Sequence, residues 1–301
     1  MNKMHKLVLG FLILLVTASS YSAEPLVKFY LSDGTFKSYD LNEIDNLQFP
    51  NAPDTLQLQV FTRDSTFYYP AQLIDSVKLF VDDTNEDRIH LWHDGFKWDF
   101  GIHEIDSILI YYTKYVAVTI GTQHWMYRNL DVDHYRNGDS IPEVRDSAEW
   151  QKSSVGAWCN LNNDSETGKI YGKLYNWYAM HDPRDLSPVG WRIPRFSEWR
   201  ELIEYIGGYS FAGAKAKEAG LEHWKEPNTS ATNESGFTAL PAGIRANFGG
   251  FGEIGYYTAF WGGKFDLDDP IHTYLYYNDL EFGNTEHGRT YGCSIRCIKN
   301  K

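Results

Sequence analysis

One apolar stripe constrains the fold more than any other feature of this chain. The stretch Tyr171–Gly208 holds three of the ten tryptophans. Within it, large apolar side chains recur at the spacing of one helix face: Trp199, Leu202, Ile203 and Ile206. Gly207 and Gly208 follow, and glycine readily adopts the left-handed backbone that ends a helix. Such a helix must bury its stripe, and the aromatic strands later in the chain are the candidates to cover it.

Composition and charge exclude some classes of protein. The chain is 43 % hydrophobic and 16 % aromatic, which is typical of a folded protein rather than a disordered one. The formal net charge of −12 argues against nucleic-acid binding, because the sequence offers no basic stripe to phosphates. We interpret the acidity as a means of keeping the protein in solution.

Residues 1–22 have the pattern of a signal peptide. Lys3 and Lys6 precede an apolar run, Leu7–Val16, that is too short to span a bilayer. Ser20–Ser22 then offers a small-x-small cleavage site before Ala23. The alternative is an uncleaved anchor. No cysteine follows the apolar run to carry a lipid and no later stretch could cross a membrane, so we expect an exported protein in the periplasm, on the cell surface or secreted.

Residues 23–113 contain three similar copies of about 30 residues, the size of one supersecondary unit. Each copy reads as a strand, a tight turn with an aspartate, a second strand and an Ile-Asp pair that leads into a third strand. The landmarks are Asp33, Asp64 and Asp94 at the turns, and Ile44-Asp45, Ile74-Asp75 and Ile105-Asp106 before the third strands. The pattern predicts an all-β module of three strand-turn-strand repeats. The aspartates could form Ca²⁺ or ligand sites, or they could simply make Asx turns.

Four motifs in the rest of the chain carry a family resemblance. They are YGKLYNWYAM at Tyr171–Met180, GWRIP with the following SEW at Gly190–Trp199, NESGFTALPAGIR at Asn233–Arg245 and SIRCIK at Ser294–Lys299. Together they resemble the Fibrobacter succinogenes major paralogous domain over roughly Val116–Lys301. We place the domain at 114–301. The resemblance implies an α+β fold with a C-type-lectin-like core, distantly similar to formylglycine-generating enzymes. It implies no particular reaction.

The start of the central helix departs from the family pattern. The family usually has Ser or Thr just after the proline, whereas this chain has Arg195 there. We therefore predict that Ser197 is the N-cap and that the helix begins at about Glu198. On this reading, Ser197→Ala costs on the order of 1 kcal/mol of stability.

A calcium-dependent sugar site is one functional hypothesis. Glu226-Pro227-Asn228 is the tripeptide with which C-type lectins hold Ca²⁺ and paired sugar hydroxyls, and Asn278-Asp279 could act as their Asn-Asp pair. Carboxylate and amide oxygens on a loop suit Ca²⁺. Trp224 lies close by in sequence and could stack on the ligand. The alternative is an exposed loop with a proline turn, and no other metal site is predicted.

The cysteines suggest either a disulfide or a reactive thiol. Cys293 and Cys297 lie four residues apart on an expected strand, too far to bond each other. In an exported protein, Cys159–Cys297 or Cys159–Cys293 is the better pairing. Formylglycine-generating enzymes use two neighbouring cysteines near the C-terminus, which invites comparison with Cys293 and Cys297. A nucleophilic thiol needs a basic setting, however, and Arg296 should point to the opposite face of the strand.

Aromatic and arginine side chains have two interpretations. Exposed rings could stack on sugars or form a protein interface, and the candidates are Trp224, Tyr256, Tyr257 and Trp261. The alternative for each of them is core packing. We interpret Arg192, Arg245 and Arg296 as buried structural residues, because each has apolar neighbours in sequence.

These observations favour a non-catalytic binding or surface-interaction protein. Its expected partner is a polysaccharide or another envelope protein, without nucleic acid and without a membrane span. The alternatives are an enzyme related to the formylglycine-generating fold and a structural component of the envelope. No cofactor is predicted apart from the Ca²⁺ of the lectin-like hypothesis.

Overall fold

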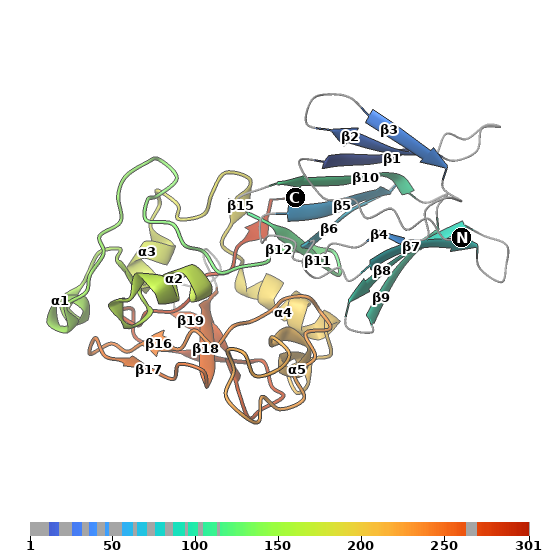
Figure 1. Ribbon diagram of the computed structural model, residues 1–301. Coiled ribbons are helices and arrows are strands. Elements are labelled where there is room, and N and C mark those ends of the chain that lie inside the picture. Colours follow the sequence, from blue (N-terminus) through green and yellow to red (C-terminus); the bar gives the residue numbers. More distant parts are fainter. Residues whose placement is uncertain are drawn as a thin grey trace. The chain divides into compact units, whose positions relative to one another are not determined.

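The protein forms two compact units, Met1–Ala117 and Val118–Lys301 (Figure 1). The computed structural model describes residues 65–69, 115–262 and 270–300 in full. For the other residues up to Tyr112, it describes only the backbone of the strands. The predicted repeats fall in the first unit, and the four family motifs fall in the second.

Every element described in the first unit is a strand. The strands are β1 (Leu12–Thr17), β2 (Leu26–Leu31), β3 (Phe36–Asp40), β4 (Asn46–Leu47), β5 (Leu56–Thr62), β6 (Thr66–Pro70), β7 (Ser76–Val81), β8 (Asp87–His93), β9 (Phe96–Gly101) and β10 (Ile105–Tyr112). They form three sheets with the orders β1-β2-β3, β10-β5-β6 and β4-β7-β8-β9. All the strand pairs are antiparallel.

Each predicted copy contributes one hairpin and one further strand. The hairpins are β2–β3, β5–β6 and β8–β9. The third strands pair outside their own hairpins, because β4 and β8 flank β7, and β10 pairs with β5. The turn aspartates lie outside the described residues, and the three-repeat module stays a prediction. Strand β1 lies inside the predicted signal peptide and pairs with β2, while the predicted cleavage site lies outside the described residues.

The second unit mixes short helices with short strands. Its strands are β11 (Ala117–Ile120), β12 (Gln123–Met126), β13 (Trp158–Asn160), β14 (Lys173–Tyr175), β15 (Trp191–Arg192), β16 (Ile244–Arg245), β17 (Phe251–Gly252), β18 (Tyr257–Trp261), β19 (Ile271–Tyr276), β20 (Gly283–Glu286) and β21 (Ile298–Lys299). Its helices are α1 (Ser147–Lys152), the 3-10 turn η4 (Leu161–Asn163), α2 (Ser165–Tyr171), α3 (Trp177–His181), α4 (Phe196–Tyr205) and α5 (Ala212–Ala216). The sheet orders are β11-β12-β21-β15, β13-β14, β16-β17 and β18-β19-β20.

The predicted apolar stripe forms the centre of the main core. Trp199, Leu202 and Ile203 of α4 are fully buried. Trp199 lies 4.6 Å from the Trp125 ring and 5.5 Å from the Phe260 ring, measured between centroids. Burying an apolar side chain of this size stabilises a fold by about 1.5–3 kcal/mol. The prediction of a helix buried against aromatic strands is therefore confirmed.

Only the C-terminal end of α4 matches the prediction. Beyond the helix, the Gly208 N–H donates to the Ile203 carbonyl at 2.8 Å, and both glycines have positive φ, as predicted. At the start, the N-cap is Arg195 rather than Ser197, which is the second residue of the helix. The Glu198 carboxylate accepts the Arg195 N–H at 2.9 Å and also pairs with Arg192. The predicted start at Glu198 and the assignment of Ser197 as N-cap are therefore wrong, and capping gives no reason to expect a cost for Ser197→Ala.

The mixed architecture agrees with the expected α+β class, with mostly strands and few helices. The C-type-lectin-like core and the all-β module ahead of it stay predictions. Among the residues that the structure describes, no helix is both long and apolar enough to cross a membrane.

Candidate functional site

The structure uses most of the predicted lectin-like residues internally. The Asn228 side chain is buried and its Nδ2 donates to the carbonyls of Glu218 and Gly220, at 2.9 and 2.7 Å. The Asp279 carboxylate accepts two N–H groups of its own loop, at 2.6 and 3.1 Å. Trp224 is buried, and its ring N–H donates to the Ala239 carbonyl at 2.8 Å. Glu226 and Asn278 are exposed.

A lysine lies between the two predicted calcium-binding segments. They meet where the Thr229 N–H donates to the Tyr277 carbonyl at 2.7 Å. The ammonium group of Lys217, which is fully buried, reaches four backbone carbonyl oxygens at this place. Their distances from Nζ are 2.8 Å to Asp279, 3.0 Å to Tyr276, 3.3 Å to Thr229 and 3.5 Å to Tyr277. These oxygens are therefore already committed to a cation that the chain itself supplies.

Burial changes the pKa of Lys217. Loss of hydration lowers the pKa of Lys217 to about 8, and the charge of Asp279 acts in the opposite direction. No signal in the sequence marked this site, because any residue type supplies a backbone carbonyl.

The predicted disulfide is absent. None of Cys159, Cys293 and Cys297 forms a disulfide, and all three are buried. Trp158 pairs with Tyr175, which pairs in turn with Cys293, so Cys159 and Cys293 lie on strands separated by another strand. That separation is about 10 Å, too far for a bridge. Cys159 and Cys297 form no bridge either, and the Cys297 carbonyl accepts the N–H of Met126 in a different sheet.

Three of the four candidate sugar-stacking rings are core residues. Trp224, Tyr257 and Trp261 are buried, whereas Tyr256 is 43 % exposed. The Tyr257 hydroxyl lies 3.0 Å from Nε2 of the buried His272, within the β18–β19 pair. Core packing is therefore the correct interpretation for the three buried rings.

A different row of partly exposed rings begins on β19 and continues in the chain that follows β20. Tyr274 and Tyr276 are two residues apart in β19, so they lie on the same side of the strand, and their ring centroids are 5.6 Å apart. His287 stacks on Tyr291 at 4.2 Å, and the buried His272 contacts both Tyr274 and His287. The Tyr274 ring lies over Gly283, where a Cβ would come within 2.4 Å of the ring. We call Tyr274, Tyr276, His287 and Tyr291 the aromatic face.

The second unit also has a polar cleft of about 350 Å³. Its lining includes an unusual number of charged and titratable side chains: Arg128, Lys169, Glu218, Glu222, His223 and Arg296. Two of the basic residues have contacts at the rim, since Lys169 pairs with Glu166 at 2.7 Å and Arg128 donates to the Lys169 carbonyl at 3.5 Å.

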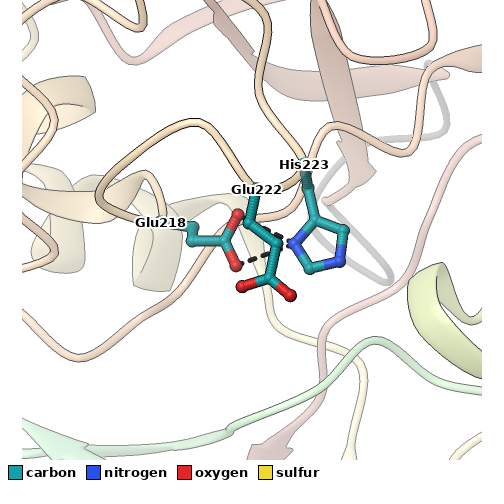
Figure 2. Close-up of side chains that lie close together, drawn as sticks. All are labelled: Glu218, Glu222 and His223. Atoms are coloured by element: carbon teal, nitrogen blue, oxygen red, sulfur yellow. Dashed lines mark hydrogen bonds and ion pairs between the residues drawn. The ribbon is translucent and has the colours of Figure 1, made fainter.

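Two carboxylates and an imidazole converge in this cleft (Figure 2). One potential ligand atom from each of Glu218, Glu222 and His223 lies within 4.8 Å of the other two. His223 Nδ1 lies 2.9 and 3.0 Å from the two Glu218 oxygens, and the Tyr171 ring packs edge-on at 5.8 Å. Burial raises the pKa of Glu218, the contact with His223 opposes this, and the charge of Glu222 adds to it.

A comparison with protein-family models identifies the second unit. The model described as the Fibrobacter succinogenes major domain matches residues 118–299, more than half of the chain. The chain belongs to this family. No curated protein and no solved structure matches it.

Motifs of the Fibrobacter succinogenes major domain build the floor of the cleft. Arg296, from the closing motif, donates through Nε to the Asn129 side chain at 2.9 Å. It also donates through Nη1 to the carbonyls of Tyr127 and Phe237, both at 2.7 Å. Arg245 is likewise buried and donates to the Gly249 carbonyl at 3.0 Å. The structural interpretation of these two arginines is confirmed, whereas Arg192 is only half-buried and pairs with Glu198 at the start of α4.

Proposed function

We propose that this protein is an exported, non-catalytic polysaccharide-binding protein and that the aromatic face is its binding surface. The observation that supports this proposal most is the row of ring contacts on β19 and beyond β20, in which the Tyr276 side chain at one end is 39 % exposed. Aromatic rings offer large apolar faces, and tyrosine adds a hydroxyl that can hydrogen-bond. A sugar chain presents C–H faces and hydroxyl groups in alternation, which matches such a row.

The state of the cysteines supports a non-catalytic role. A thiol enzyme needs an accessible thiolate, which requires a lowered pKa. Here burial raises the pKa of Cys159 to about 12 and raises that of Cys293 still further above its ordinary value. Cys297 is equally buried. The burial of all three thiols supports a binding role over a thiol enzyme of the formylglycine-generating kind.

Removing the exposed ring should weaken polysaccharide binding. We expect Tyr276→Ala to lower affinity for the bound glycan about tenfold, because an aromatic contact contributes about 0.5–1.5 kcal/mol beyond its buried area. Glycan-array screening of the full chain would find the ligand, and affinity electrophoresis in a gel that contains it would measure the change. Tyr205→Ala is the matched control, since Tyr205 is exposed on α4, outside the aromatic face.

Two results would count against this proposal. One is equal retardation of the Tyr276→Ala chain and the control chain in the gel. The other is the failure of the full chain to bind any glycan on the array, which would favour the structural envelope component instead.

Export rests on the residues of the signal peptide and predicts a defined mature start. We expect the protein recovered from an expressing bacterium to begin at Ala23, because Ser20–Ser22 offers the small side chains that signal peptidase requires. N-terminal sequencing of the recovered protein measures this directly. A protein that keeps Met1 and stays in the cytoplasm would contradict it.

A further inference from the structure

Glu218, Glu222 and His223 have the composition of a transition-metal site. Glu218 follows α5 and is anchored by its N–H, which donates to the Ala239 carbonyl at 3.1 Å. Glu222 and His223 follow in the next connection, and Figure 2 shows the three side chains close together, with Glu218 bonded to His223. All three side chains line the cleft, and the cleft gives them access to solvent.

The distances are close to those that an ion requires. Zinc binds carboxylate oxygen and imidazole nitrogen at about 2.0–2.2 Å, so neighbouring tetrahedral ligands lie roughly 3.4 Å apart. The three atoms now lie within 4.8 Å of one another, so a closure of at most about 1.4 Å is needed. The exposed Glu222 side chain can supply most of this movement by rotating about its own bonds.

The cluster also has an unbalanced charge. Glu222 makes no hydrogen bond or ion pair with any residue that the structure describes, although its charge acts on Glu218. The imidazole of His223 contacts Glu218 but offers at most one positive charge to two carboxylates. A divalent cation would neutralise both carboxylates at once, and imidazole among the donors favours zinc-like ions over Ca²⁺.

We propose that Glu218, Glu222 and His223 bind a divalent transition-metal ion, with zinc as the best match, in the polar cleft. Three protein ligands leave one tetrahedral position open. A water molecule or an anionic group can fill that position, and Arg128 and Lys169 on the cleft wall favour an anion. This site is separate from the aromatic face and does not depend on polysaccharide binding.

Zinc titration of the chelator-treated full chain tests the proposal. At neutral pH, isothermal titration calorimetry should show one saturable zinc site. Glu222→Gln should weaken zinc binding at least tenfold and His223→Gln by a similar factor, because each removes a ligand. Binding should also weaken at acidic pH, because protons compete with the metal ion for its ligands. Titration with Ca²⁺ should give a much weaker signal.

The matched control is Glu226→Gln, which removes an exposed carboxylate a few residues away without changing the cluster. Its zinc affinity should equal that of the unaltered chain. Melting curves show whether each variant folds, and the exposed position of Glu222 makes Glu222→Gln the decisive one. A chain without a saturable zinc site would overturn the proposal, and so would zinc binding that survives Glu222→Gln and His223→Gln unchanged. Tyr276→Ala should leave zinc binding intact, so the two proposals can fail separately.

Discussion

Replacing Arg296 with lysine is expected to lower the free energy of unfolding of the second unit by about 3 kcal/mol or more. The guanidinium is buried and serves the Asn129 side chain and the carbonyls of Tyr127 and Phe237 at the same time. It also packs on the Phe237 ring at 4.5 Å. Lysine keeps the charge but lacks the planar fork, so several buried acceptors would lose their donor. Urea unfolding followed by tryptophan fluorescence measures the change.

The control for this substitution is Arg200→Lys on the exposed side of α4. It should change the free energy of unfolding by no more than about 0.5 kcal/mol. If Arg296→Lys behaved like this control, Arg296 would not be holding together the floor of the cleft.

The stability of the protein should rise with pH through the titration of Lys217. The folded protein has a Lys217 pKa of about 8, against 10.5 for an ordinary lysine. Between these values the unfolded chain holds a proton that the folded chain has released, so raising the pH favours the folded state. Below pH 8 both states are protonated and the slope disappears. The full difference corresponds to about 3 kcal/mol.

Lys217→Met isolates this contribution from the other groups that titrate in the same range. The free energy of unfolding of the unaltered chain, minus that of Lys217→Met, should increase steadily from pH 8 to pH 10.5. Lys225→Met, which alters an exposed lysine nearby, should follow the unaltered chain throughout. A difference that stays constant would mean that Lys217 has the same pKa in the folded and the unfolded chain, because the four carbonyl oxygens stabilise the ammonium as well as water does.

The sequence was informative where side-chain identity determines the outcome. The spacing of Trp199, Leu202 and Ile203 predicted the buried helix, because periodic apolar residues must face the core. Gly207 and Gly208 predicted where the helix ends, because few other residues adopt positive φ. The family motifs predicted the mixed fold and the family to which the chain belongs.

The predictions failed where the structure depends on backbone geometry or on contacts between residues far apart in the sequence. The N-cap prediction depended on finding Ser or Thr, whereas the N-cap is Arg195, whose N–H donates to the Glu198 carboxylate. The disulfide prediction lacked the strand order that separates Cys159 from Cys293. The cleft was missed because its floor and walls come from motifs far apart in sequence, and the spacing of Glu218, Glu222 and His223 differs from common metal-binding motifs such as His-Glu-x-x-His.

The sheet order β11-β12-β21-β15 has a consequence for how the domain can be rearranged. The first and last strands of the family domain, β11 and β21, are separated by only one strand and therefore lie about 10 Å apart in the sheet. A short glycine-rich bridge could therefore join them, and new ends could be opened in an exposed connection such as that at Val189. A circular permutant of this kind would keep the aromatic face and the polar cleft intact.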